Sequence, residues 1–465
     1  MDISDIGYSV KQLRQKFAQS TGLPLGQALS AATIEAALRA EGVTYRACLL
    51  DPVVTVWAFL SQIIDTDRSC RKALSRVWAY LSDQAPEPIL IDPEAVADTG
   101  AYCKARQRLP EGVVKRLYGQ VADHLEDGVE ATRRWWGRRV FLADGTTVLL
   151  PDTPANQAAY PQHPNQQPGC GFPLLKVVAL FSLATGALKG AIHQVWSAYE
   201  PKLLRQLHNV LAARDVLVGD RIYGTYTHIA GWTQQQVDVL FRLHQARTTD
   251  FRQGTRLGKD DRLVVWGKPR QRPKELSLEA YQQLPDTLTV RLLRFAVSRK
   301  GFRAKPVTVV TSLLDPLRYR KEEIARLYGL RWEVELDLRH LKATMEMDML
   351  RTKSPDMIHK ELAIYFLAYN LIRSLMSHAA RAYGRDPLRL SFKATLQHLN
   401  TFLPLLALAN TRQRAAYYET LLRLVARERL PDRPHRVEPR LVKRRPKCSR
   451  WMQQPRAVLK RKLAA

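Results

Sequence analysis

The chain has 465 residues and carries 72 Lys and Arg side chains against 44 Asp and Glu, a formal net charge of +28. Its 46% apolar and 25% charged residues are typical of globular proteins and argue against a disordered or fibrous chain. Five scattered cysteines argue against a disulfide framework or a zinc ribbon, and the sequence predicts no membrane span. The excess of positive charge indicates a polyanionic partner, and nucleic acid fits best.

Residues 1–135 are predicted to be helical, because apolar residues recur at helical spacing in three successive segments. This part of the chain is the predicted DNA-binding domain. Basic side chains cluster on two of the segments, and the candidate phosphate contacts are Arg68, Arg71, Lys72, Lys104, Arg106 and Arg108. A basic helix also occurs as a solvated polar face, so both interpretations stay open.

From residue 136 the pattern changes to short runs rich in Val, Leu and Ile, separated by Gly and Pro. Through residue 246 the order is three strands, helix, strand, helix, strand. This order predicts an α/β fold with a mixed sheet and is compatible with a ribonuclease-H-like core. More strand-like runs occupy residues 247–310, and helices follow to about residue 430. Residues 431–465 hold five prolines and a net charge of +10, which predicts a basic, disordered tail.

A helix predicted from Lys321 to Met347 has a polar stripe with a single acid. At about 100° per residue, one face holds the residues at offsets 0, 3, 7, 11 and 14, namely Tyr328, Arg331, Glu335, Arg339 and Lys342. A carboxylate among cations suits a metal-dependent phosphodiester site, because the acid holds a divalent ion and the cations hold the DNA backbone. An exposed helix with an Arg331–Glu335 ion pair explains the same pattern.

Two aspartates follow apolar runs. Asp144 ends the run VFLA and precedes Gly145, so it fits either a functional acid or a tight Asp-Gly turn. Asp220 ends the run DVLVG, a position at which both functional residues of α/β sheets and ordinary helix caps occur. Neither aspartate decides the function alone.

Taken together, these residues resemble a known family. The spacing Y-x2-R-x3-E-x6-K is met by Tyr328, Arg331, Glu335 and Lys342. The segments ADGT around Asp144 and GDRIYG around Asp220 are similar to the first and second acidic boxes of the same family, and ARQRLP is similar to a motif upstream of them. Over roughly residues 100–380 the chain resembles the DDE transposases of bacterial insertion sequences, in the insertion-sequence 4 family.

The resemblance implies a ribonuclease-H-like core in which Asp144, Asp220 and Glu335 are both the catalytic triad and the metal ligands. They would hold two Mg²⁺ ions, for which Mn²⁺ can substitute. The Tyr, Arg and Lys of the signature contact DNA near the cut in this family, which assigns that role to Tyr328, Arg331 and Lys342. Arg339 joins them because it shares their stripe.

The separation of 115 positions from Asp220 to Glu335 exceeds the spacing in retroviral integrases, so an insertion is expected. Residues 247–310 resemble the β-rich insertion of the family, and Trp266 is the candidate to stack on a flipped base. A tryptophan packed in the core of the insertion is the alternative. The core would then comprise residues 136–246 and 311–380, and residues 381–430 a helical region suited to dimerisation.

The expected function is cut-and-paste transposition. The protein would bind terminal inverted repeats and target DNA as a homodimer in a synaptic complex, in the bacterial cytoplasm at the nucleoid and without a membrane. The rival hypotheses are a metal-dependent nuclease that does not join strands, and a domesticated derivative that binds DNA without moving it.

Overall fold

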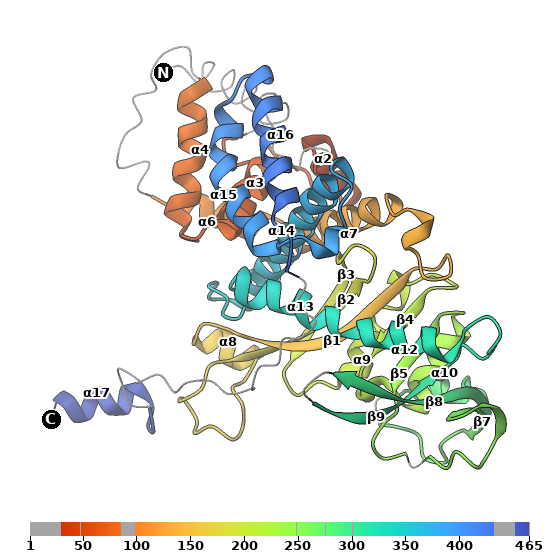
Figure 1. Ribbon diagram of the computed structural model, residues 1–465. Helices are drawn as coiled ribbons and strands as arrows, with labels where there is room; N and C mark the ends of the chain where they lie inside the picture. Colours follow the sequence, from red (N-terminus) through yellow and green to blue (C-terminus); the bar gives the residue numbers. More distant parts are fainter. Residues whose placement is uncertain are drawn as a thin grey trace. The chain divides into compact units, whose positions relative to one another are not determined.

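The computed structural model describes residues 29–46, 48–84, 98–247, 249–274, 276–299, 302–431 and 452–464. It divides into two compact units (Figure 1). The helical unit comprises Met1–Val129, Thr185–Lys189 and Arg339–Leu430, and the sheet unit comprises Glu130–Ala184, Gly190–Leu338 and Pro431–Ala465. Each unit therefore combines segments that are far apart in the sequence.

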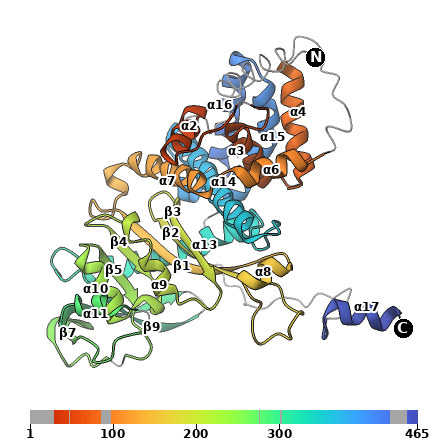
Figure 2. The same cartoon turned by 180° about the vertical axis from the view of Figure 1, so that it is seen from behind.

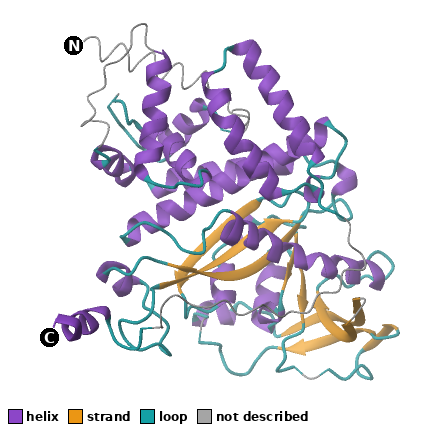
Figure 3. Cartoon of the chain, turned by 60° about the vertical axis from the view of Figure 1, so that its left-hand side comes forward, coloured by secondary structure: helices purple, strands orange, loops and turns teal. Residues whose placement is uncertain are grey.

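The helical unit contains helices that come before and after the sheet strands in the sequence. Figure 3 shows helices in purple and strands in orange. They are α2 (Ala31–Ala40), α3 (Pro52–Ile64), α4 (Cys70–Gln84), α6 (Gly100–Arg108), α7 (Glu111–Asp127), α14 (Pro355–Ala382), α15 (Phe392–Leu408) and α16 (Thr411–Arg427). Local signals begin several of them. Asp51 caps α3 by accepting a hydrogen bond from the Val54 amide at 2.9 Å, and Pro52 stands at the first helical position.

Helix α14 is the centre of this unit, packed against α3, α7 and α16. Its apolar run is interrupted by Asn370, which is fully buried. The Asn370 amide donates to the carbonyls of Tyr118 and Leu188, and its oxygen accepts from the Leu188 amide. Asn370 therefore links α14 to α7 and to the start of the segment that forms strand β3 (Leu188–Val195). Among the helices described, none combines the length and hydropathy that crossing a membrane requires.

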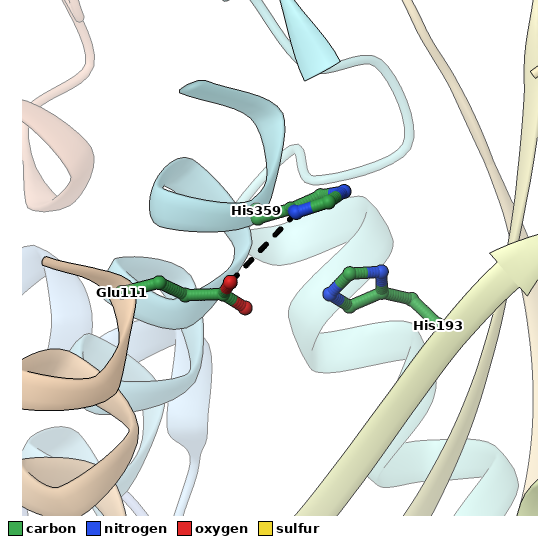
Figure 4. A group of neighbouring side chains, drawn as sticks. All are labelled: Glu111, His193 and His359. Atoms are coloured by element: carbon green, nitrogen blue, oxygen red, sulfur yellow. Dashed lines mark ion pairs between the residues drawn. The ribbon is translucent and has the colours of Figure 1, made fainter. Parts of the chain in front are cut away.

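An ion pair also joins α7 to α14. Glu111, the first residue of α7, has its Oε2 3.7 Å from Nδ1 of His359 (Figure 4). Glu111 also pairs with Lys115 one turn later, at 2.8 Å. His193, drawn in the same figure, is a residue of strand β3 in the sheet unit.

The described strands form one nine-stranded sheet in the order β3-β2-β1-β4-β5-β9-β8-β7-β6. Strand β1 is antiparallel to β2 and parallel to β4, and β4 is parallel to β5. The first five strands thus have the order and directions of a ribonuclease-H-like core, and the predicted mixed α/β fold is confirmed. Their bounds are β1 Val140–Leu149, β2 Leu174–Ser182, β3 Leu188–Val195, β4 Val216–Gly219 and β5 Asp238–Arg242.

Short helices cover both faces of the sheet. In Figure 2, α9 (Glu200–Arg205) and α10 (Tyr226–Gln234) lie in front of it, whereas α12 (Lys321–Gly329) lies in front in the opposite view of Figure 1. The described connections also include α8 (Pro154–Ala159) and α11 (Leu278–Gln282). Apolar residues of α9 and α10 pack on Phe141 and Leu217, so the core lies under these helices.

The predicted β-rich insertion extends the core sheet. Strands β6 (Thr255–Gly258), β7 (Asp261–Gly267), β8 (Thr287–Arg299) and β9 (Phe302–Thr311) are consecutive antiparallel neighbours, and β9 pairs with β5. Apolar residues of the insertion share one cluster with the core strands; they include Trp266, Leu284, Val290 and Val310. These residues of the insertion therefore share the hydrophobic core of the sheet.

Two segments differ from the prediction. The single helix expected from Lys321 to Met347 is α12, a 3₁₀ turn (Leu330–Trp332), α13 (Glu333–Arg339) and a π-helical turn (His340–Thr344). In the tail predicted to be disordered, residues 432–451 lie outside the described residues, but Arg456–Ala464 forms helix α17.

Candidate active site

The two predicted aspartates stand at matching positions on neighbouring parallel strands. The last register pair of β1 with β4 is Leu142 with Val218, and Asp144 and Asp220 each come two residues later. Because parallel strands run in the same direction, both carboxylates are delivered to one edge of the sheet. The Asp-Gly pair is not a tight turn, since β1 continues through Gly145 to Leu149.

Strand composition explains this placement. Val140–Ala143 and Val216–Gly219 are buried, and Asp144 and Asp220 are the first partly exposed residues after them. A polar side chain at that point marks where the strand leaves the core. Asp144 Oδ1 accepts a hydrogen bond from the Gly145 amide at 2.8 Å, which orients the carboxylate.

The third acid, Glu335 on α13, is paired with Arg331. The Arg331 Nη2 donates to Glu335 Oε1 at 2.9 Å, and both side chains are partly buried. Burial opposes the charge of Arg331, but Tyr328, Glu335 and Asp220 together raise its pKa above the usual value. The guanidinium therefore lies within the electrostatic reach of the acids on the strands and on the helix.

The first acid, Asp144, has a raised pKa. Burial raises its pKa to about 6, Glu200 and Glu335 add to the shift, and the Gly145 amide and Arg331 oppose it. Among the described residues, no three carboxylates of this group have oxygens within 4.8 Å of one another. Partly exposed carboxylate oxygens in this number suit hard divalent cations.

Tyr328 completes the signature in the sheet unit. It is buried and makes an edge contact with Phe295, with ring centroids 6.3 Å apart. Burial raises its pKa to about 12, with Arg331 opposing and Asp220 supporting the shift. The phenol therefore stays protonated at neutral pH and faces the same charged groups as Arg331.

The last two signature residues lie beyond α13. Arg339 is exposed and Lys342 is partly buried, and both belong to the helical unit. In the π-helical turn the Met345 amide bonds to the His340 carbonyl, five residues back. This turn interrupts the 100° periodicity from which the continuous stripe was predicted.

The predicted DNA contacts of the first helices separate into two groups. Arg71, Lys72, Lys104 and Arg108 are exposed. Arg68 and Arg106 are only 5% and 7% exposed. Arg68 binds the Ile63 carbonyl and Glu346, and the Arg106 guanidinium lies about 5 Å from the ring centres of Phe59 and Tyr102. Both guanidiniums are therefore engaged inside the helical unit, and their role as phosphate contacts stays a prediction.

Trp266 is also buried, with 9% of its surface exposed. It belongs to the hydrophobic cluster of the sheet, and the Arg247 guanidinium lies over its ring at 3.8 Å. In this arrangement the ring offers no open face to a base, so the placement fits the alternative of a core tryptophan.

One acid near the site was missed by the sequence interpretation. Glu200, the first residue of α9, packs against Gly145 and raises the pKa of Asp144. It follows the third predicted strand directly, as Asp144 and Asp220 follow theirs, and that position was the available signal.

A ribonuclease-H-like sheet with acids at two parallel strand ends and on a following helix defines the class of metal-dependent nucleotidyl-transfer enzymes. The family described as Transposase DDE domain matches residues 135–371, and the chain belongs to it. It is therefore a DDE transposase, an enzyme that cleaves and transfers DNA strands, as the sequence predicted.

The chain is also similar to known transposases. The transposase InsG for insertion sequence element IS4 of Escherichia coli strain K12 is 28% identical over 427 residues, 91% of this chain and 92% of InsG. The transposase for insertion sequence element IS421 of Escherichia coli is 32% identical over 84 residues, 17% of this chain and 22% of its own length. A piggyBac transposase synaptic complex with hairpin DNA aligns at a TM-score of 0.43 and 10% identity, covering 90% of this chain and 83% of that one.

Proposed function

We propose that this transposase excises an insertion sequence at its terminal inverted repeats and joins the 3′-hydroxyls to target DNA. Asp144, Asp220 and Glu335 are the proposed catalytic residues. The observation that carries this assignment is their common electrostatic environment, since each of the three acids acts on Arg331 or is acted on by it.

The same three carboxylates are the proposed ligands of two Mg²⁺ ions, with Mn²⁺ as a substitute. Such ions, when bound, activate the attacking hydroxyl or water and stabilise the leaving oxygen of an in-line displacement. Glu335, which accepts a hydrogen bond from Arg331, would hold an ion together with the two aspartates. Arg331 would hold a phosphate oxygen near the cut, and the protonated Tyr328 would donate a hydrogen bond there.

DNA binding is proposed for the exposed cations. Arg71, Lys72, Lys104 and Arg108 are exposed on α4 and α6 and would contact the transposon ends. Arg339 and Lys342 are proposed phosphate contacts after the catalytic helix. A homodimer that pairs two ends, acting at the bacterial nucleoid, follows from this function.

The test uses the complete insertion sequence on a plasmid, with purified protein and Mg²⁺. Asp144→Asn, Asp220→Asn and Glu335→Gln should each abolish excision while end binding persists. Glu322→Gln, an exposed acid on α12, is the matched control and should cleave normally. Normal cleavage by Glu335→Gln would disprove the assignment.

A second assay supplies pre-cleaved ends and a target plasmid. Insertion of the ends supports transposition. Cleavage without insertion would instead support the rival nuclease function, and end binding without either reaction a domesticated derivative.

A further inference from the structure

A fourth carboxylate lies beside the proposed triad. The Glu200 carboxylate occupies the space that a side chain at position 145 would fill: its Cδ and Oε2 are 2.6 Å, and its Oε1 2.9 Å, from the place where a Cβ on Gly145 would stand. Any other residue at position 145 would force the carboxylate end of Glu200 to shift. Asp144 binds the amide of the same Gly145, so both carboxylates rest against one residue.

The sheet is open at this point. Strand β4 ends at Gly219, so no register pair links β1 to β4 beyond Leu142. Successive side chains of a strand project to opposite faces, and Gly145 therefore faces away from the side chain of Asp144. At an open strand end, a ligand can be reached by carboxylates from both faces.

A buried hydroxyl is directed at the same acids. Tyr223 is fully buried. Burial raises its pKa well above the usual value, and Glu200, Asp144, Asp220 and a hydrogen bond with Glu200 add to the shift. Buried hydroxyls are normally satisfied, and the Glu200 carboxylate is the acceptor within reach of this one.

One cation approaches Glu200 from the sheet. Lys176 of β2 has its Nζ 3.5 Å from Glu200 Oε1 and donates to the Ala198 carbonyl at 2.8 Å. Lys176 and Arg331 pair with Glu200 and Glu335, and Asp144 and Asp220 form no ion pair among the described residues. Carboxylates that are not paired with a cation of the protein favour a divalent cation.

We propose that Glu200 is a fourth carboxylate of the metal centre and that position 145 is glycine to admit it. Glu200 and Asp144 share one divalent ion. The inference rests on the proposed function of Asp144, but it assigns a ligand outside the triad.

The test measures Mn²⁺ binding to the full chain without DNA, by titration calorimetry and by the electron paramagnetic resonance signal of free Mn²⁺. We expect Glu200→Gln, which keeps the shape of the side chain, to weaken binding by about tenfold or more. Glu279→Gln, an exposed acid on α11, should bind like the wild type. Unchanged Mn²⁺ binding by Glu200→Gln would overturn the proposal.

Lys176→Met separates a metal ligand from a mere ion-pair partner. As a ligand, Glu200 should bind Mn²⁺ equally well or better without Lys176, because a competing cation is removed. If Glu200 only positions Lys176, then Lys176→Met should weaken Mn²⁺ binding as much as Glu200→Gln, and the proposal fails. Asp144→Asn tests the proposed function separately: unchanged Mn²⁺ binding in that variant would contradict the triad itself.

Gly145→Ala tests the role of the glycine. The added Cβ collides with Glu200, so we expect weaker Mn²⁺ binding and a lower melting temperature. Adding Glu200→Ala to Gly145→Ala removes the collision, and should restore the melting temperature without restoring Mn²⁺ affinity. Normal Mn²⁺ affinity in Gly145→Ala would contradict the close approach.

Discussion

One group of polar side chains in each unit illustrates two kinds of environment. In the helical unit, Arg68 and Asn370 are buried and hydrogen-bonded to carbonyls and amides. In the sheet unit, Asp144 is perturbed by burial and lies within the electrostatic influence of Arg331, Glu200 and Glu335. Satisfied polar groups stabilise a fold, whereas crowded like charges cost stability and mark a site that binds something else. The groups that a polar side chain contacts, rather than its burial or charge, therefore indicate whether it stabilises the fold or belongs to a binding site.

The largest expected effect is in the sheet unit. Asp144→Asn should lower Mg²⁺-dependent cleavage by at least about a thousandfold, because a metal ligand contributes several kcal/mol to the transition state. The melting temperature without metal should stay equal or rise, since the substitution removes a charge from a crowded acidic group. Cleavage assays and thermal melts measure both. A clear fall in melting temperature would instead indicate that Asp144 stabilises the fold.

A structural polar residue should behave in the reverse way. Asn370→Ala leaves the carbonyls of Tyr118 and Leu188 and the Leu188 amide without their partner, and should lower the free energy of unfolding by about 3 kcal/mol or more. Urea denaturation measures this loss. Gln397→Ala, an exposed position on α15, is the control and should change stability by less than about 0.5 kcal/mol. A similarly small loss for Asn370→Ala would remove the contrast between the units.

Substitutions of exposed and of buried cations in the helical unit should have different effects on DNA binding and on stability. The double variant Arg71→Gln with Lys72→Gln should reduce the magnitude of the negative slope of log binding constant against log salt concentration by about 2, because about one counterion is released per phosphate contact. Its stability should be unchanged. Arg68→Gln should instead lower stability, since it breaks contacts with Ile63 and Glu346. An unchanged salt slope in the double variant would contradict the proposed DNA face.

The smallest effect concerns one buried histidine in each unit. Burial, with Arg205 near His228 and with Arg373 and Arg339 near His340, lowers the pKa of both rings to about 3. The unfolded chain takes up the protons first, so stability is lost as the pH falls from about 6.5 towards 3. Between pH 7 and 6 each ring should cost less than about 1 kcal/mol.

His228→Gln tests this effect, because the amide oxygen can still accept the Trp232 indole N–H. Urea denaturation at several pH values should show a flatter loss of stability towards acid in this variant. An unchanged pH profile would mean that His228 does not carry the effect.

Much of the fold was predictable. The order of short apolar runs predicted the mixed sheet, because alternating and apolar patterns are local. The family was predicted from the resemblance of the signature and the two aspartate segments to a known family. The roles of Asp144, Asp220 and Glu335 stay predictions, although their shared environment supports them. Glu200 could not be found by spacing, since it reaches Gly145 across 55 residues of chain.

The sequence alone determined the class of enzyme and the candidate acids, because strand ends and helix faces are local features. Only the tertiary structure decided which charged residues are buried. Arg68 meets Glu346 and Trp266 joins the core of the sheet through contacts between distant segments. Packing of that kind leaves no local pattern, so a basic helix in the sequence contained both a structural arginine and the exposed cations proposed to bind DNA.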